Sequence, residues 1–318
     1  MLLNYLIPET GNAYKANFHC HSTNSDGAFS PEEIRRLYRE NGYSIVAFTD
    51  HWTYVDNSAL SEPGFLALSG YELNFDLREG PNRRLLRTCH LCAIARDPKH
   101  CAPIPGEGEY DIAGINRAIE ALNAGGFIVN LNHTSWSAMP EEDIRSIRGI
   151  VGMELFNSTC DFAFQGRAEL YHYMQAIIGG RHLLPIAADD NHYGTFGRGK
   201  PRAAEDCCRA FLMIKADRLE YEAVLDAYLA GHYYCSNGPR IHSAYIEGDW
   251  LVVDCSPVRR AYLKTKYVTF NDAVVRRHDT LTHVEFDLTQ FRKDCPFVMV
   301  LLEDESGRFA CTVPYYFH

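Results

Sequence analysis

Residues 17–27, NFHCHSTNSDG, place His19 and His21 one position apart, and Asp26 follows five positions after the second histidine. The first five letters of this stretch predict a short strand. Because side chains alternate between the two faces of a strand, both histidines point to one side and Cys20 to the other. Two imidazoles in this arrangement can hold the same cation, so the stretch predicts a chelating pair at a strand end.

The residues behind this strand predict a helix. Residues 30–42 read SPEEIRRLYRENG, in which Ser30 is a suitable N-cap and Pro31 stands at the first helical position. Glu33 completes a capping box with the serine, and Gly42 is a typical helix end. The two elements together form a strand–helix unit.

The same alternation continues from residue 15 to about residue 235 and favours an α/β fold with a parallel sheet or barrel. Strands are predicted at residues 44–51, 65–73, 89–95, 127–133, 152–157 and 182–192, and helices at residues 111–126, 165–180 and 216–231. After residue 240 the helical period disappears and short β runs follow, with DESG at 304–307 as a hairpin turn. We therefore expect a barrel domain over 1–240 and a small antiparallel, sandwich-like domain over 241–318.

Composition excludes several classes of partner. The 318 residues carry 31 Lys and Arg against 41 Asp and Glu, a formal charge of −10, which disfavours nucleic acid or a membrane surface as the main partner. The first fifteen residues have no basic region and too short an apolar run for a secretory signal, so we expect a soluble, cytosolic protein. Eleven scattered cysteines fit reduced, buried thiols, and the single CxxC at Cys89 and Cys92 is a weak zinc motif.

Titratable side chains gather at the predicted strand ends. Strand C-termini of a parallel barrel converge on one face, where functional residues meet. Imidazoles and carboxylates there are ligands for zinc, manganese or iron, and bound cations remove the cost of clustering buried charges. The residues in question are His19, His21, Asp50, His51, Glu72, His90, His133, Asp190 and His192.

The ordered set HCHSTNSDG, FTDH, YEL, HLCAIA, NLNH and ADDNH resembles the polymerase and histidinol phosphatase (PHP) family of metal-dependent phosphoesterases. The resemblance spans about residues 17–240 and implies a distorted seven-stranded β/α barrel. It also implies two or three divalent ions, zinc, manganese or iron. Carried over residue by residue, the ligand sets are His19, His21, Glu72 and Asp190 for one ion, Glu72, His90 and His133 for a second, and Asp26, His51 and His192 for a third.

Within this resemblance, Asp190 is preferred to Asp189 because its parity matches that of His192, and Glu154 is a candidate for supporting the ligands. The third ion is the least firmly implied, because family members differ at the position of Asp26. We expect Glu72, Asp190 and His192 to take part in catalysis.

The implied reaction is hydrolysis of a phosphomonoester of a small metabolite or nucleotide by a metal-activated water. Phosphate also attracts cations, and Arg87, Arg198 and Lys200 are candidates for binding it. Trp52 and Tyr193 flank ligands and are candidates for a base or sugar pocket, or for plain packing. Two alternatives stay open: the same metal ring acting on an amide or lactone, and a non-catalytic PHP module used for partner binding.

Overall fold

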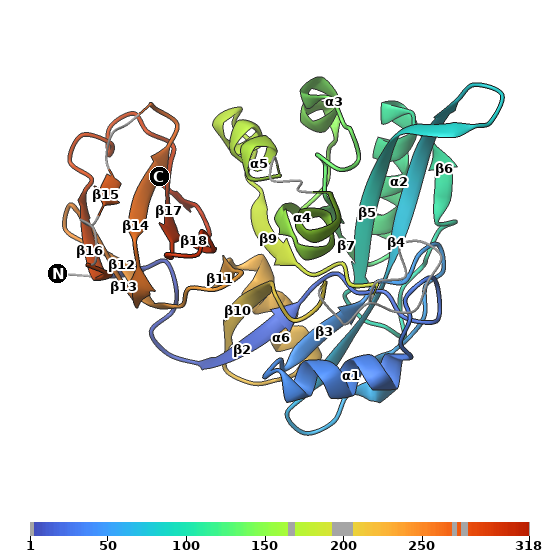
Figure 1. The fold of residues 1–318 in the computed structure, drawn as a ribbon, viewed down its shortest axis with the longest axis horizontal. Helices are drawn as coiled ribbons and strands as arrows, with labels where there is room; N and C mark the ends of the chain where they lie inside the picture. The colour runs from blue at the N-terminus through green and yellow to red at the C-terminus, as the bar shows by residue number, and fades with distance from the viewer. Residues whose placement is uncertain (1–2, 165–168, 193–205, 269–271, 275–278, 318) are drawn as a thin grey trace.

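The computed structural model describes residues 3–164, 169–192, 206–268, 272–274 and 279–317, and shows a mixed α/β fold with one large sheet. Figure 1 shows the strands after residue 240 gathered at one end of the molecule and the first strand–helix units at the other. The described helices are α1 (Pro31–Glu40), α2 (Ile112–Ala124), α3 (Glu141–Ser146), α4 (Ser158–Phe164), α5 (Glu169–Ile178), α6 (Tyr221–Leu229) and the 3₁₀ turn η1 (Ser58–Leu60).

The large sheet contains most of the strands. Its order is β15 (Asp272–Val274), β14 (Arg260–Thr265), β17 (Phe297–Glu303), β18 (Phe309–Thr312), β11 (Tyr233–Ser236), β10 (Phe211–Ala216), β2 (Asn12–Asn17), β3 (Ile45–Phe48), β4 (Leu66–Glu79), β5 (Arg84–Ala95), β7 (Phe127–Leu131), β8 (Gly152–Asn157) and β9 (Leu184–Ala188). Two short strands join it at the side, β6 (Glu107–Glu109) on β4 and β19 (Tyr315–Tyr316) on β17.

The first strand–helix unit forms as its local sequence predicts, with one difference. The Ser30 hydroxyl oxygen accepts the Glu33 backbone amide, and the Glu33 carboxylate accepts the Ser30 backbone amide, so the predicted capping box is confirmed. Gly42 follows the helix with a positive φ of 76°, which glycine adopts without strain. Strand β2, however, ends at Asn17, so the two histidines lie just beyond the strand and not inside it.

The expectation of a parallel sheet over residues 15 to about 235 is wrong at β10, which runs antiparallel to both β2 and β11, and at β5. Strand β5 runs antiparallel to both β4 and β7. The reason is the connection: β4 and β5 are joined by the short turn at 80–83, where the Arg83 amide donates to the Gly80 carbonyl, whereas a parallel pair needs a crossover of a dozen or more residues. The hairpin keeps Glu72 and His90 on adjacent strands.

The strands β2 to β9 curve so that the last approaches the first. Beyond the strand ends, a parallel bridge joins Cys20 to Asn191. The Asp190 amide donates to the His19 carbonyl at 3.0 Å, and the His21 amide donates to the Asn191 carbonyl at 3.3 Å. The described strands do not form a continuous closed barrel, because β2 pairs with β10 along its length. The bridge nevertheless brings the residues after β2 beside those after β9.

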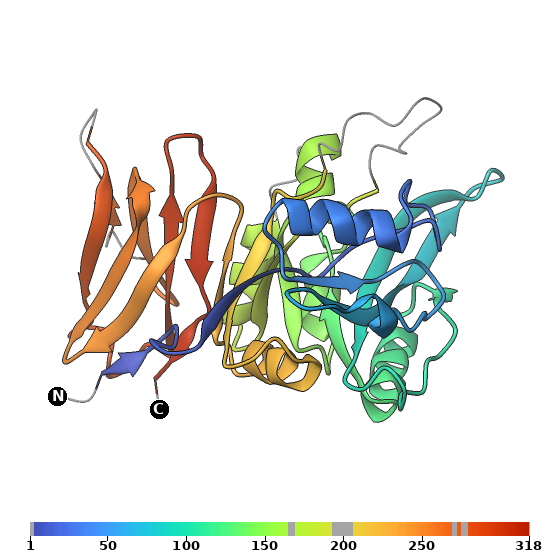
Figure 2. The same cartoon turned by 90° about the horizontal axis from the view of Figure 1, so that it is seen from below.

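The strands after residue 240 form two layers over a shared core. A four-stranded sheet contains β1 (Asn4–Tyr5), β12 (Ile241–Glu247), β13 (Trp250–Val258) and β16 (Leu281–Asp287). Most of its buried apolar side chains share one cluster with Ala261 and Leu263 of β14 and with Val298, Val300 and Leu302 of β17. Figure 2 shows these layers at one end of the molecule. Pairing of β17 with β18 confirms the hairpin predicted at 304–307. Strands on either side of residue 240 pair with each other, so the boundary stays a prediction.

Two simpler findings concern the whole described chain. All eleven cysteines are free thiols, and most of them are buried. No helix among the described residues combines the length and the apolar character that a membrane span requires.

Candidate metal centre

The predicted ligands come from separate segments and meet at one end of the strands. His19 and His21 follow β2, Glu72 lies in β4, and the remaining members follow or lie in other strands: His51 after β3, His90 in β5, His133 after β7, and Asp190 and His192 after β9. Most are buried, while the Asp26 side chain is 49% exposed on the loop after His21. A pocket of about 240 Å³ opens over Asp26, His51, Glu72, His90, His133, Asp190 and His192.

The innermost group contains His19, His21, Glu72 and Asp190. The Nε2 atom of His19 lies 3.2 Å from Glu72 Oε1 and 3.2 Å from Asp190 Oδ1. The Nε2 atom of His21 lies 3.0 Å from Asp190 Oδ1 and 3.4 Å from Glu72 Oε2. The two Nε2 atoms are 3.1 Å apart. The structure thus brings the four predicted ligands of the first ion around one point.

A second group of imidazoles also approaches the Glu72 carboxylate, and two of them share its Oε1 atom with His19. His90 Nδ1 lies 3.1 Å and His133 Nε2 3.3 Å from Glu72 Oε1. His51 Nδ1 lies 3.1 Å from Glu72 Oε2, and His51, Glu72 and His90 form a possible ligand group of their own. The resemblance assigned His51 to the third ion alone, so its approach to Glu72 is a feature that the sequence did not predict.

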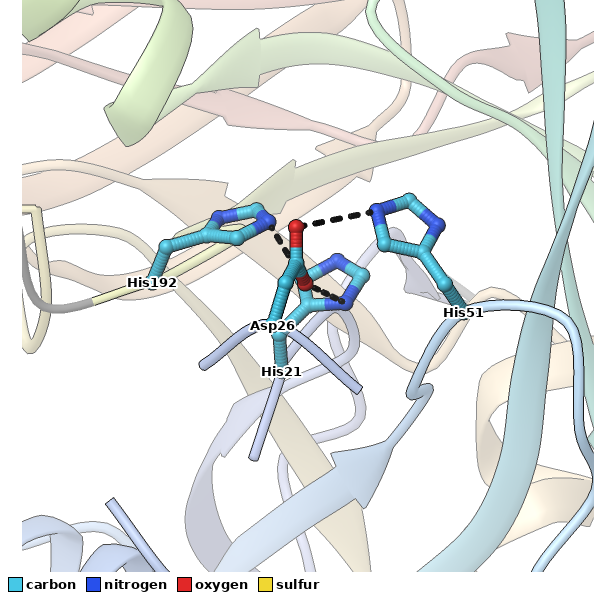
Figure 3. Close-up of side chains that lie close together, drawn as sticks. All are labelled: His21, Asp26, His51 and His192. Carbon is cyan, nitrogen blue, oxygen red and sulfur yellow. Dashed lines mark ion pairs between the residues drawn. The ribbon is translucent and has the colours of Figure 1, made fainter. Parts of the chain in front are cut away.

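The third group lies nearest to solvent and is shown in Figure 3. Asp26 points toward three imidazoles, with its oxygens 3.4 Å from His192 Nε2, 3.8 Å from His21 Nδ1 and 3.9 Å from His51 Nε2. His21 belongs to this group as well as to the innermost one, since it presents Nδ1 here and Nε2 there. The looser distances and the exposed carboxylate set this group apart from the other two.

The donor atoms fit divalent cations better than they fit each other. Four buried atoms of the cluster lack a hydrogen-bond partner within the described residues: His21 Nδ1, His51 Nδ1, Glu72 Oε2 and Asp190 Oδ1. Buried polar atoms of this kind are costly when they stay unpaired. Convergent nitrogen and carboxylate lone pairs, about 3 Å apart, are the arrangement that zinc, manganese or iron satisfies.

Burial and the neighbouring charges shift the pKa values of the clustered side chains in different directions. Burial opposes the charged form, but nearby imidazoles, His19 first among them, hold the pKa of Glu72 well below its ordinary value. Burial, together with His192 and His51, lowers the pKa of His21 to about 3. Burial also lowers the pKa of His192, yet the hydrogen bond to Asp26 and the charge of Asp190 outweigh it and raise that pKa to about 9. The imidazoles therefore differ widely in how readily they release a proton to a metal.

Glu154 contacts two of the predicted ligands, His19 and His133, on the side away from Glu72 in the case of His19. One carboxylate oxygen lies 2.8 Å from Nδ1 of His19, and the other accepts the His133 backbone amide at 2.8 Å. With the Nδ1 proton held by Glu154, His19 turns Nε2 toward the cluster. Asn157 donates to both Glu154 and Asp190 at 3.0 Å, which ties the two carboxylates together.

Asp189 and Asp50 make hydrogen bonds to loop residues instead of to the cluster. Asp189 accepts the Tyr38 hydroxyl at 2.9 Å and three backbone amides from residues 208–210, and burial raises its pKa to about 6. Asp50 accepts the backbone amide and the hydroxyl of Ser22 at the start of the loop that carries Asp26. Of the pair at 189 and 190, the second therefore lies in the cluster.

None of the three residues predicted to bind phosphate is seen to line the pocket in the described part of the chain. The Arg87 guanidinium pairs with Asp143 at 3.3 Å and packs over the Tyr110 ring, and it does not line the pocket. Arg198 and Lys200, like Tyr193, lie outside the described residues. Trp52 stacks on His51 with ring centroids 5.0 Å apart. The sequence did not predict Trp136, Thr159 and Cys160 as pocket residues, although Trp136 stands three positions after His133.

Comparisons with known proteins find similar structures only. No known family and no curated protein matches the chain. A two-domain protein from Bacteroides vulgatus, described as containing a predicted PHP-like metal-dependent phosphoesterase, is 16% identical over 98% of this chain and 97% of that chain, with a TM-score of 0.47. A protein from Bifidobacterium adolescentis, described as a putative metal-dependent phosphoesterase, is 17% identical over 61% of this chain and 92% of that chain, with a TM-score of 0.41.

A third similar structure is an amidohydrolase from Chromobacterium violaceum with bound sulfate and no metal. It is 14% identical over 56% of this chain and 87% of that chain, with a TM-score of 0.40. One of these three structures is described as containing a predicted PHP-like phosphoesterase.

Proposed function

We propose that the chain is a metal-dependent phosphoesterase of the PHP type that hydrolyses phosphomonoesters of small molecules. One observation carries the proposal: every ligand that the sequence predicts lies in a single cluster around Glu72, with buried donor atoms that have no other partner in the described chain. The quoted motifs add the phosphoester specificity, by resemblance. In this proposal the seven strands β2, β3, β4, β5, β7, β8 and β9 correspond to the family's distorted barrel over 1–240, joined between its first and last strands, among the described residues, only by the Cys20–Asn191 bridge, and the 241–318 β domain follows.

The ligand sets follow the groups described above. We assign one ion to His19, His21, Glu72 and Asp190, a second to Glu72, His90 and His133 with His51 nearby, and a third to Asp26, His51 and His192. The mixed nitrogen and oxygen donors suit zinc, manganese or iron. Bound divalent ions supply Lewis acidity and a water of lowered pKa at this place.

The protein's own side chains position the ions and the substrate and supply a proton to the leaving group. Glu72 turns Oε1 toward His19, His90 and His133 and Oε2 toward His21 and His51. Asp190, held by Asn157, fixes the innermost group. His192 has a pKa of about 9 and holds a proton next to Asp26 at the pocket edge at neutral pH. That proton is placed for transfer to the departing alcohol oxygen. Asp26, His51 and His192 would hold a third ion only after His192 has released this proton, so we infer two bound ions near pH 7.

A second candidate is hydrolysis of an amide or lactone by the same cluster. One observation favours it: within the described residues, no arginine or lysine lines the pocket. A phosphate dianion gains from fixed cations, whereas a neutral ester or amide does not need them. The two candidates therefore differ in the charge of the substrate that they require.

A panel assay tests the proposal. Metal-loaded protein is incubated with p-nitrophenyl phosphate and mononucleotides, and released inorganic phosphate is measured with and without chelator. His19→Ala should abolish release, whereas His283→Ala, which changes an exposed histidine paired with Asp254, should leave it unchanged. Turnover of amide or lactone substrates without any phosphate release would replace the proposal with the second candidate.

A further inference from the structure

The pocket over the cluster has a wall that the proposed ligands do not form. Trp136, Thr159 and Cys160 line the same cavity as Glu72 and the imidazoles. The Thr159 hydroxyl donates to the Asp190 carbonyl at 2.6 Å, and both Thr159 and Cys160 are nearly fully buried. Trp136 is partly exposed and is the largest apolar side chain in this wall. The pocket therefore has a charged floor and an apolar, aromatic side.

The Trp136 indole lies directly beside two of the proposed ligands. Its ring centroid is 5.6 Å from that of His90 and 5.0 Å from that of His133, with interplanar angles of 67° and 85°. These are edge-to-face contacts, a preferred arrangement of aromatic pairs. A group that packs on the indole inside the pocket is consequently adjacent to the cluster.

The turn that carries Trp136 is held at several points. The Ser137 amide donates to the His133 carbonyl at 3.1 Å, and the Met139 amide donates to the Thr134 carbonyl at 3.1 Å. The Ser137 hydroxyl lies 3.1 Å from His133 Nδ1, so the turn and the ligand are fixed together. Ala138 has a φ of 52°, a strained value for a residue with a side chain. The indole is thus positioned before any substrate binds.

We propose that Trp136 selects the alcohol part of the substrate, and that this part is a planar unsaturated ring bonded to the phosphate directly or through one or two atoms. The inference rests on the proposed phosphoesterase function and adds a substrate class to it. Because the indole lines the pocket and contacts His90 and His133, a ring that packs on it at the usual centroid separation of about 4.5–7 Å lies next to a phosphoryl group on the cluster. A nucleobase is held further from its phosphate by a ribose, and fits this spacing less well.

A matched pair of substrates tests the selection. Benzyl phosphate and cyclohexylmethyl phosphate release alcohols of similar reactivity and size, and differ in the planarity of the ring. With metal-loaded wild type, we expect kcat/KM to favour the benzyl ester about two- to tenfold, the range that an aromatic pair contributes. Trp136→Leu should bring the ratio close to one, Trp136→Phe should keep an intermediate ratio, and Trp250→Leu, at an exposed tryptophan of β13, should change nothing.

Binding provides a second readout that does not depend on turnover. Isothermal titration with benzylphosphonate and cyclohexylmethylphosphonate should show the same preference in wild type and its loss in Trp136→Leu. A benzyl preference that survives in Trp136→Leu would overturn the assignment while leaving the phosphoesterase intact. A Trp136 effect seen with AMP against ribose 5-phosphate, but not with the benzyl pair, would overturn the short spacing. If no ester is cleaved and neither phosphonate binds, the proposed function fails as well.

Discussion

Replacing Glu154 with glutamine probes the support of the cluster without removing a proposed ligand. Glu154 is buried, and its two oxygens receive the Nδ1 side of His19 and the His133 amide, each at 2.8 Å. A glutamine of the same size can accept only one of these bonds, because its amide nitrogen meets the other donor. Loss of such an outer contact typically weakens metal binding about 10- to 100-fold, which is about 1.4 to 2.7 kcal/mol.

The assay is a competition titration of zinc against a chromophoric chelator, with Glu154→Gln compared to wild type. Glu285→Gln is the matched control, because Glu285 also pairs with a histidine, His283, but on the exposed face of β16. The variant should bind its tightest ion at least tenfold more weakly, and the control should bind as wild type does. Equal affinities in Glu154→Gln and wild type would refute the idea that this carboxylate orients His19.

Three further perturbations follow from particular contacts. The hydrogen bond to Asp26 outweighs burial and raises the pKa of His192 to about 9, so an ion that binds His192 displaces a proton. The affinity for that ion should therefore rise about tenfold per pH unit from pH 7 to 9 in zinc titrations. An affinity that does not change with pH would argue against His192 as a ligand. Ser30→Ala removes the α1 cap and should lower the free energy of unfolding in urea by about 1 kcal/mol, and unchanged stability would contradict this role. In Gly27→Ala, the new Cβ would lie 2.3 Å from the His21 carbonyl oxygen, so the Asp26 loop must shift and metal analysis should find fewer bound ions than in wild type; full occupancy would refute that expectation.

Local signals made part of the fold predictable. The capping box of α1 forms as predicted, and Asp111 caps α2 at the start of the helix predicted over 111–126; both signals are encoded within a few residues. The direction of β5 depends on the length of its connection to β4, which an apolar run does not reveal. Strand β10, which pairs with both β2 and β11, was not predicted at all, because its position is set by partners far away in the chain.

The candidate site was predictable to a similar degree. Period-two alternation selected Asp190 over Asp189, and the structure places Asp190 beside His19 and His21. Alternation cannot show that one imidazole serves two groups, as His51 does when it approaches both Glu72 and Asp26. Contacts of that kind depend on how the loops beyond the strands fold against each other.

Anomalous X-ray diffraction from crystals soaked with zinc or manganese tests the central claim most directly. The account predicts at least two strong peaks flanking the Glu72 carboxylate, one in contact with His19, His21 and Asp190 and the other with His90 and His133. Ordered crystals in the presence of excess metal that show no peak within bonding distance of Glu72 would contradict it.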